Sequence, residues 1–289
     1  MNNILSEKEY QRYIIDQLVK PECGYVEAPA TEFDRLFAMN RKALFTFLDD
    51  TQPEKMEALR KIYKEKAEDT IIAFINQQET RANGSRLDVL KHGVELANIH
   101  LDLMYTKPAT TFNKELNALY HKNIFTVSEE VWASNDERID LVIFLNGLAI
   151  ITFELKCNAA GQSYQDAIYQ YRMERNPKDR LFLWKAGSLV NFAMDLEQVY
   201  MCTKLSGSST FFLPFNMGCG EGIQIGAGNP VLEDEYSVHY MWDDILQKDS
   251  LLESLGKFMF IEVSEKEDAN GKVKKNETVI SFGVSLLCG

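Results

Sequence analysis

Three charged residues stand on two segments that are otherwise apolar at nearly every position. Asp140 lies in the run 139–145, and Glu154 and Lys156 belong to the run 149–156. Because burying an unpaired charge is costly, these groups need an ionic partner or a metal. Two carboxylates offer the hard oxygen ligands that Mg²⁺ prefers, and a neighbouring lysine could orient or deprotonate a water molecule. The spacing predicts a metal-assisted hydrolytic site, with a buried ion pair involving Lys156 as the alternative.

The geometry of the hairpin decides whether the two carboxylates meet. The apolar runs flank Asn146-Gly147, a strong hairpin signal. A two-residue turn there would pair Asp140 with Phe153 and send Glu154 to the opposite face. A three-residue loop that begins one residue earlier would pair Asp140 with Thr152 and leave Glu154 on the same face. We predict the longer loop, and carboxylates on opposite faces would eliminate the site.

The remaining periodicity predicts an α/β fold, a mixed β-sheet flanked by helices with an N-terminal helical region. Strands that are apolar on both faces require helices on both sides of the sheet. One domain is expected, with a mainly helical region over 1–98, a core over 99–216 and a C-terminal extension over 217–289. Helices are expected over 6–19, 34–49, 53–78, 87–96, 163–175 and 242–256. Strands are expected over 99–104, 124–132, 139–145, 149–156, 181–184, 189–194, 198–204, 210–215 and 258–264, with a charged hairpin tip or loop at 265–276.

Composition excludes several classes of protein. The 289 residues carry a net charge of −12, which speaks against autonomous binding of nucleic acid through bulk positive charge. The five cysteines are scattered without a CxxC pair, and the four histidines lack metal-ligand spacing. There is no secretion signal and no apolar run long enough to span a membrane. A cytoplasmic location is expected.

The helix after the second run adds polar groups that could face phosphates: Gln165, Gln170, Arg172 and Arg175. At these residues the chain resembles the N-terminal nuclease domain of type I restriction enzyme restriction subunits, a member of the PD-(D/E)XK superfamily. The resemblance extends in order over essentially the whole chain. It rests on 87–94, 137–156, 161–172, 197–216, 226–230 and 242–258.

The resemblance implies roles for particular residues. Asp140 matches the motif aspartate, and Glu154 and Lys156 match ExK. Gln170 matches the glutamine of a following QxxxY motif, although Glu174 stands where the tyrosine would be. Such nucleases often carry an acidic residue on the metal side of the first helix. Either Glu7 or Glu9 could fill that position, and Glu9 as a helix cap is the alternative.

The resemblance also implies an activity, a cofactor and partners. It implies a Mg²⁺-dependent endonuclease that cuts double-stranded DNA together with modification and specificity subunits. Full restriction subunits continue into an ATP-driven translocase, but this sequence has no GxxxxGK[ST] motif. We therefore expect no ATP binding and a truncated or split subunit, or a chain cut for expression. The alternatives are a non-catalytic docking module for restriction-modification partners and a stand-alone repair nuclease of the same superfamily.

Overall fold

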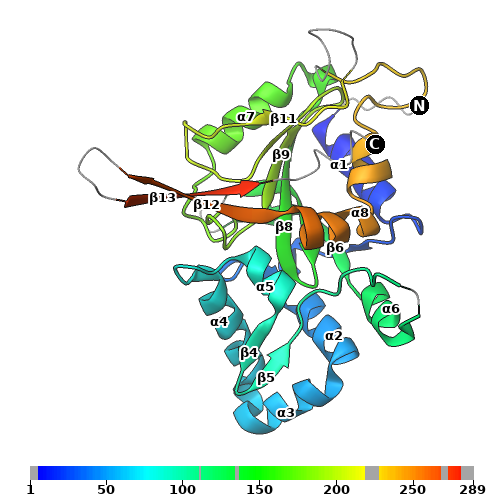
Figure 1. The fold of residues 1–289 in the computed structure, drawn as a ribbon. Helices are drawn as coiled ribbons and strands as arrows, with labels where there is room; N and C mark the ends of the chain where they lie inside the picture. The colour runs from blue at the N-terminus through cyan, green and yellow to red at the C-terminus, as the bar shows by residue number, and fades with distance from the viewer. Residues whose placement is uncertain (1–5, 111, 134–136, 219–227, 268–272, 281–289) are drawn as a thin grey trace.

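A mixed sheet forms the centre of the molecule, as the ribbon of the computed structural model shows (Figure 1). The structure describes residues 6–110, 112–133, 137–218, 228–267 and 273–280. The sheet has nine strands, with the main path β1-β6-β7-β8-β9-β10-β11, and β3 pairs with both β2 and β8. The β1–β6 and β8–β9 pairs are parallel and the others are antiparallel. The predicted mixed α/β fold is confirmed.

Most strands of the sheet come from the middle of the chain, but three short ones come from the N-terminal region. The strands are β1 (Val26–Glu27), β2 (Phe33–Asp34), β3 (Met39–Asn40), β6 (Phe125–Trp132), β7 (Arg138–Leu145), β8 (Leu148–Leu155), β9 (Val190–Met194), β10 (Val199–Cys202) and β11 (Leu213–Pro214). Every residue of β8 is buried, as is all of β7 after Arg138. The apolar composition of these two strands thus reflects cover on both faces.

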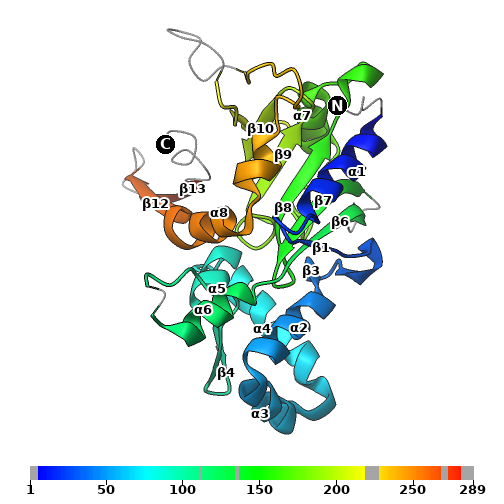
Figure 2. The same cartoon turned by 90° about the vertical axis from the view of Figure 1, so that its right-hand side faces the viewer.

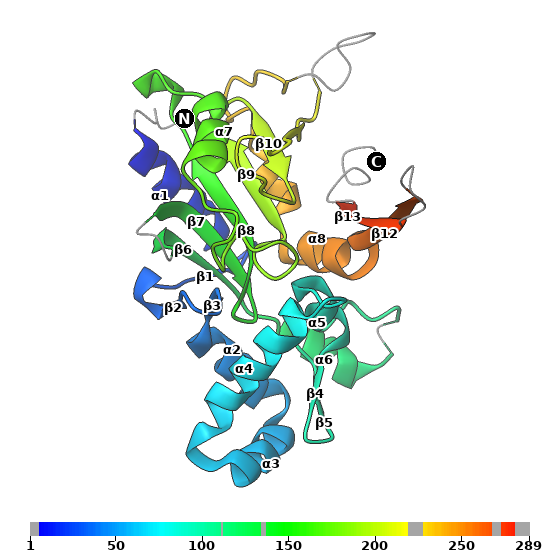
Figure 3. The same cartoon turned by 90° about the vertical axis from the view of Figure 1, so that its left-hand side faces the viewer.

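One helix lies on each face of the sheet beside the central hairpin. Helix α1 (Glu7–Leu18) contacts β6 and β8 through buried residues spaced four apart, Tyr10, Ile14 and Leu18. Helix α7 (Tyr164–Met173) covers the other face and contacts β8, β9 and β10. Figures 2 and 3 view the molecule from opposite sides, with α1 nearer the viewer in the first and α7 in the second.

A helical lobe lies below the sheet in Figure 1. It contains α2 (Arg41–Thr51), α3 (Pro53–Tyr63), α4 (Ala67–Thr80), α5 (Arg86–His92) and α6 (Lys114–His121), with the small hairpin of β4 (Val94–Leu96) and β5 (Ile99–Leu101). The C-terminal region continues as a π-helix (Met241–Ile245), α8 (Lys248–Glu253), a second π-helix (Ser254–Phe258) and the β12 (Phe260–Glu267) and β13 (Val273–Ile280) hairpin. Short 3₁₀ turns occupy Ala30–Glu32, Lys64–Lys66 and Asn158–Ala160.

Several predicted boundaries are wrong for local reasons. The expected helix over 53–78 divides into α3 and α4 because Lys64 has φ 54°, outside the helical region. The helix predicted from residue 34 begins only at Arg41, where the Asn40 side chain caps it by accepting the Ala43 N–H. Residues 181–184 form turns rather than a strand, and α6 was not predicted.

Two features considered in the sequence, the cysteines and the capacity of helices to span a membrane, can be followed in the described residues. Cys23, Cys157 and Cys202 are buried and are not disulfide-bonded, whereas Cys219 and Cys288 lie outside the described residues. None of the helices in the described ranges combines the length and apolar character needed to cross a lipid bilayer.

A fully buried arginine joins the helical lobe to the sheet. Arg86, at the start of α5, donates from Nε and Nη2 to the Glu79 carboxylate of α4 at 2.8 and 3.1 Å. Its Nη1 donates to the carbonyls of Ala38 and Ala149, and its Nη2 donates to that of Phe37. Both partners of the ion pair are inaccessible to solvent. The guanidinium therefore uses two donors for Glu79 within the lobe and three for carbonyls of the sheet region, one of which belongs to the central hairpin.

Loss of this arginine should destabilise the whole fold. Arg86→Met removes one arginine of a buried ion-pair cluster, leaves Glu79 bonded to Arg180, and takes the guanidinium donors away from the carbonyls of Phe37, Ala38 and Ala149. We expect the free energy of unfolding to fall by about 3–5 kcal/mol, measured by urea denaturation. The matched control is Arg60→Met, since Arg60 makes a similar bidentate pair with Asp49 but is 41% exposed, and about 1 kcal/mol or less is expected. Equal losses in the two variants would contradict this assignment.

Candidate functional site

The central hairpin turns more tightly than the sequence analysis expected. Leu145 pairs with Leu148, so the turn has only two residues, Asn146 and Gly147. Both adopt positive φ, 49° and 83°, a conformation that suits Asn-Gly and matches the twist of the strands. The predicted three-residue loop is therefore wrong.

A β-bulge in β8, and not a longer loop, shifts the register of the hairpin by one residue. Phe144 pairs with Ala149, but Ile143 pairs with Ile151, so Ile150 is the extra residue. The register then runs on to Leu141 and Phe153.

This register settles the position of the acidic pair. One further step sets Asp140 opposite Glu154, and residues directly opposite each other share a face. The predicted pairing of Asp140 with Thr152 is wrong, because Thr152 pairs with Val142. The two carboxylates nevertheless lie together.

Donors from outside the hairpin satisfy the bulge. The Ala149 carbonyl accepts from Arg86 Nη1 at 2.9 Å, and the Ile150 carbonyl accepts from the Leu189 N–H at 2.8 Å. The Ala149 N–H donates to the Ala38 carbonyl at 3.3 Å. Because buried backbone groups need partners, these contacts stabilise the irregular register. Arg86, which joins the helical lobe to the sheet, thus also stabilises the register of β8.

Asp140 is a buried carboxylate in an unfavourable electrostatic setting. Its Oδ2 accepts the Leu155 N–H at 2.7 Å. Burial raises its pKa well above the ordinary value, and the negative charge of Glu154 raises it further. The Leu155 hydrogen bond opposes this shift only in part. A cation placed here would relieve both unfavourable contributions.

Glu154 is fully buried and uses its two oxygens differently. Oε1 accepts from Arg175 Nε at 2.7 Å, whereas Oε2 is buried and has no hydrogen-bond partner among the described residues. Burial raises the pKa of Glu154 to about 6, against the opposing effect of Arg175. An unpartnered buried carboxylate oxygen beside a second carboxylate is what a metal ligand set requires.

Lys156 contacts a residue from the first helix. Its Nζ donates to Glu7 Oε2 at 2.9 Å, and its side chain is almost entirely buried. Glu7 is therefore the first-helix acid that reaches the site. The Glu9 N–H instead donates to Ser6 Oγ in the helix cap. The ion pair of Lys156 is thus made with α1 and not with either strand carboxylate.

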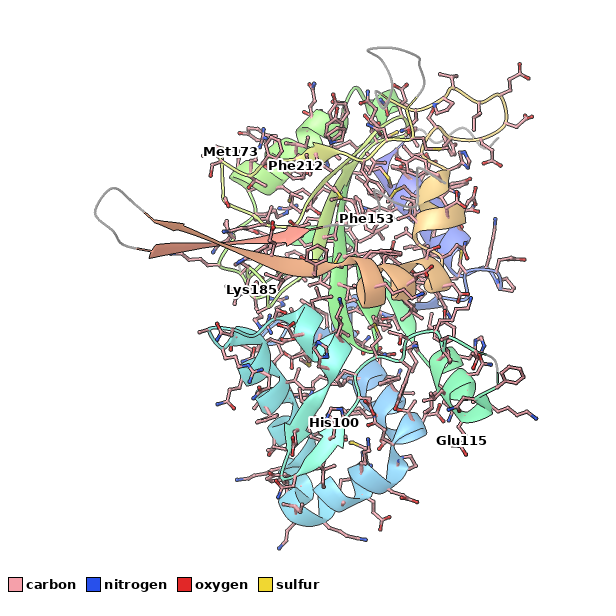
Figure 4. All side chains as sticks on the ribbon, in the orientation of Figure 1. His100, Glu115, Phe153, Met173, Lys185 and Phe212 are labelled. Atoms are coloured by element: carbon pink, nitrogen blue, oxygen red, sulfur yellow. The ribbon has the colours of Figure 1, made fainter. Side chains whose placement is uncertain are left out.

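The polar residues of α7 do not act as one group. Gln170 Oε1 is buried and has no hydrogen-bond partner among the described residues, and Glu174 is the C-cap residue. Arg172 donates to the Thr210 carbonyl and lies over the ring of Phe212, a residue that Figure 4 shows beside Met173 at α7. Arg175, predicted as a possible phosphate contact, instead donates to Glu154, a contact that no sequence signal indicated.

The arrangement fits a Mg²⁺ ion. Among the described residues, no group of three or more His, Cys, Asp or Glu side chains is placed to hold a metal. Mg²⁺ needs no such cage, since it is commonly bound through one or two carboxylates, water molecules and substrate phosphates. Figure 4 places Phe153, the neighbour of Glu154, in the central sheet and His100 in the helical lobe. Asp140 and Glu154 are the residues that would hold the ion.

Removing the charge of Asp140 should stabilise the metal-free protein. Because the folded-state pKa is raised, protonation favours the fold, and this contribution is lost as pH rises through that pKa. Asp140→Asn should add roughly 1–2 kcal/mol to the free energy of unfolding at about pH 8. The gain should vanish near pH 4, where the wild-type carboxyl is protonated.

Urea titrations at several pH values, with chelator present, would measure this difference. The control is Asp16→Asn at an exposed position of α1, expected to change stability by about 0.5 kcal/mol or less. A destabilised Asp140→Asn protein at alkaline pH would show that the buried charge is not unfavourable.

Comparison with known families agrees with the resemblance seen in the sequence. The family model described as "Type I restriction enzyme R protein N terminus" matches residues 4–210, a span that includes Glu7, Asp140, Glu154, Lys156 and Gln170. A search of curated proteins gives no match. Since the matched span exceeds half of the 289 residues, the chain belongs to the family of type I restriction enzyme R protein N-terminal domains, and its role is that of a restriction-endonuclease component.

Proposed function

We propose that this chain is the Mg²⁺-dependent endonuclease domain of a type I restriction system and cleaves phosphodiester bonds of double-stranded DNA. The observation that carries the proposal is Glu154 Oε2, which is buried beside Asp140 and has no hydrogen-bond partner in the part of the chain that the structure describes. These two carboxylates would hold the ion, which supplies positive charge to polarise the phosphate and lower the pKa of a bound water.

The other residues of the site would orient and stabilise. Lys156, held by Glu7, would stabilise negative charge that develops on the phosphate or orient the attacking water. Gln170 has a buried carbonyl oxygen that could accept a hydrogen bond from that water.

The acidic charge of the chain favours a site that depends on partner subunits. A protein with net charge −12 gains little from counterion release, the main source of non-specific DNA affinity. In this proposal the modification and specificity subunits hold the DNA, in the cytoplasm, and this chain supplies the cutting site. ATP has no proposed role within the chain.

Cleavage should depend on all three charged residues of the hairpin. Asp140→Ala, Glu154→Ala and Lys156→Ala should each reduce Mg²⁺-dependent plasmid cleavage by at least about 100-fold, because each removes charge at the reacting phosphate. The assay uses the chain alone and then with modification and specificity subunits. Glu9→Gln, on the same first turn as Glu7, is the control and should cut normally.

Two outcomes would redirect the assignment. Wild-type cleavage by all three variants in a competent complex would refute the proposed site. Binding to the partner subunits without any metal-dependent cleavage by the wild-type chain would favour the docking module.

Metal binding should be visible without activity. At a Mg²⁺ concentration about 100 times its Kd, binding to the folded state alone stabilises by about 2.7 kcal/mol, which a thermal unfolding scan detects. The effect should be smaller near pH 5, because Glu154, with a pKa of about 6, is then largely protonated. Asp140→Asn should lose the response, and an equal response in that variant would place the ion elsewhere.

A further inference from the structure

Arg175 occupies an unusual position behind the candidate metal site. It lies two residues beyond the end of α7 and is only 7% exposed. Its Nε donates to Glu154 Oε1 at 2.7 Å, and its Nη2 donates to the Arg138 carbonyl at 3.1 Å. Its own N–H donates to the Gln170 carbonyl at 3.1 Å. The guanidinium is thus fixed between the start of β7 and the end of α7.

These contacts constrain the Glu154 side chain. A glutamate has three side-chain torsions, and a freely rotating carboxylate could present either oxygen to an ion. With Oε1 held by Nε of a guanidinium that Nη2 anchors to the Arg138 carbonyl, the remaining oxygen, Oε2, is the one left without a hydrogen-bond partner among the described residues. Arg175 touches no atom that would react, so any contribution it makes passes through Glu154.

Other charged groups surround Glu154 but serve different partners. Asp140 faces it from β7, Lys156 follows directly after the end of β8, and Tyr171 and Arg175 approach from the α7 side. Lys156 is bonded to Glu7, and the Tyr171 hydroxyl lies 2.8 Å from Thr152 Oγ1.

We infer that Arg175 is a positioning residue that holds Glu154 by Oε1 so that Oε2 is presented, together with Asp140, to the metal ion. The inference rests on the proposed function, because it assigns Glu154 as a metal ligand. It differs from a direct phosphate contact, which would require Arg175 to leave Glu154. Removing Arg175 should therefore weaken metal binding before it affects DNA binding.

The experiment compares Arg175→Lys and Arg175→Met with the wild-type chain. A lysine can still bond Glu154 but lacks the fork that also reaches the Arg138 carbonyl, whereas methionine fills the space without a donor. The first readout is the Mg²⁺ concentration that gives half of the maximal thermal shift, measured without DNA. The second is the Mg²⁺ concentration for half-maximal plasmid cleavage, compared with the rate at saturating Mg²⁺.

We expect both Mg²⁺ midpoints to rise by about tenfold or more in Arg175→Met and by a smaller factor in Arg175→Lys, typical of losing an outer-shell partner of a metal ligand. The rate at saturating Mg²⁺ should recover substantially in the lysine variant. The matched control is Arg172→Met, which removes a nearby arginine of α7 that bonds the Thr210 carbonyl and not a carboxylate. Its Mg²⁺ midpoints should not change.

Three results would overturn the inference. Unchanged Mg²⁺ midpoints in both Arg175 variants, with or without a lower melting temperature, would reduce the residue to a structural role. Unchanged midpoints combined with weaker DNA binding in the absence of metal would identify a phosphate contact. If the wild-type chain shows no thermal response to Mg²⁺, the proposed function itself fails. This result differs from failure of the inference alone, because it is seen in the wild-type chain and does not involve the Arg175 variants.

Discussion

The site depends on one extra residue in one strand. Side chains alternate between faces along a strand, so a single-residue change of register decides whether Glu154 faces Asp140 or lies away from it. With the two-residue Asn146-Gly147 turn alone, Glu154 would lie on the face opposite Asp140. The bulge at Ile150 brings the two carboxylates to the same face. That bulge persists because Arg86 and Leu189 satisfy its carbonyls. The connection between the helical lobe and the sheet and the geometry of the acidic pair therefore share one set of hydrogen bonds.

The acidic pair destabilises the fold, and each charged residue of the site is stabilised by a different partner. Arg175 supports Glu154, the Leu155 N–H supports Asp140, and Glu7 supports Lys156. None of these contacts joins the two carboxylates to a common cation, so their mutual repulsion remains. In the proposed function, a bound ion would offset this repulsion, in line with the common loss of stability at functional sites.

The sequence was sufficient for the elements of the structure that depend on local pattern. The hairpin, α1, α7 and the mixed sheet followed from periodicity, and the charges in apolar strands identified Asp140, Glu154 and Lys156 as residues of interest. The bulge could not be predicted, because the groups that stabilise it lie far away in the chain. The choices of Glu7 over Glu9 and of Arg175 as the partner of Glu154 likewise depend on how α1 and the end of α7 pack.

Positive charges around the candidate site are already bonded within the protein. Lys156, Arg175 and Arg172 are each bonded to a protein oxygen, and Arg138 pairs with Glu130. Phosphates approaching this surface would compete with existing partners, which weakens binding and leaves specificity to other contacts. In the proposed function, a bound metal would add positive charge at the reacting phosphate. In the proposed function, this arrangement suits a site whose DNA is positioned by other subunits.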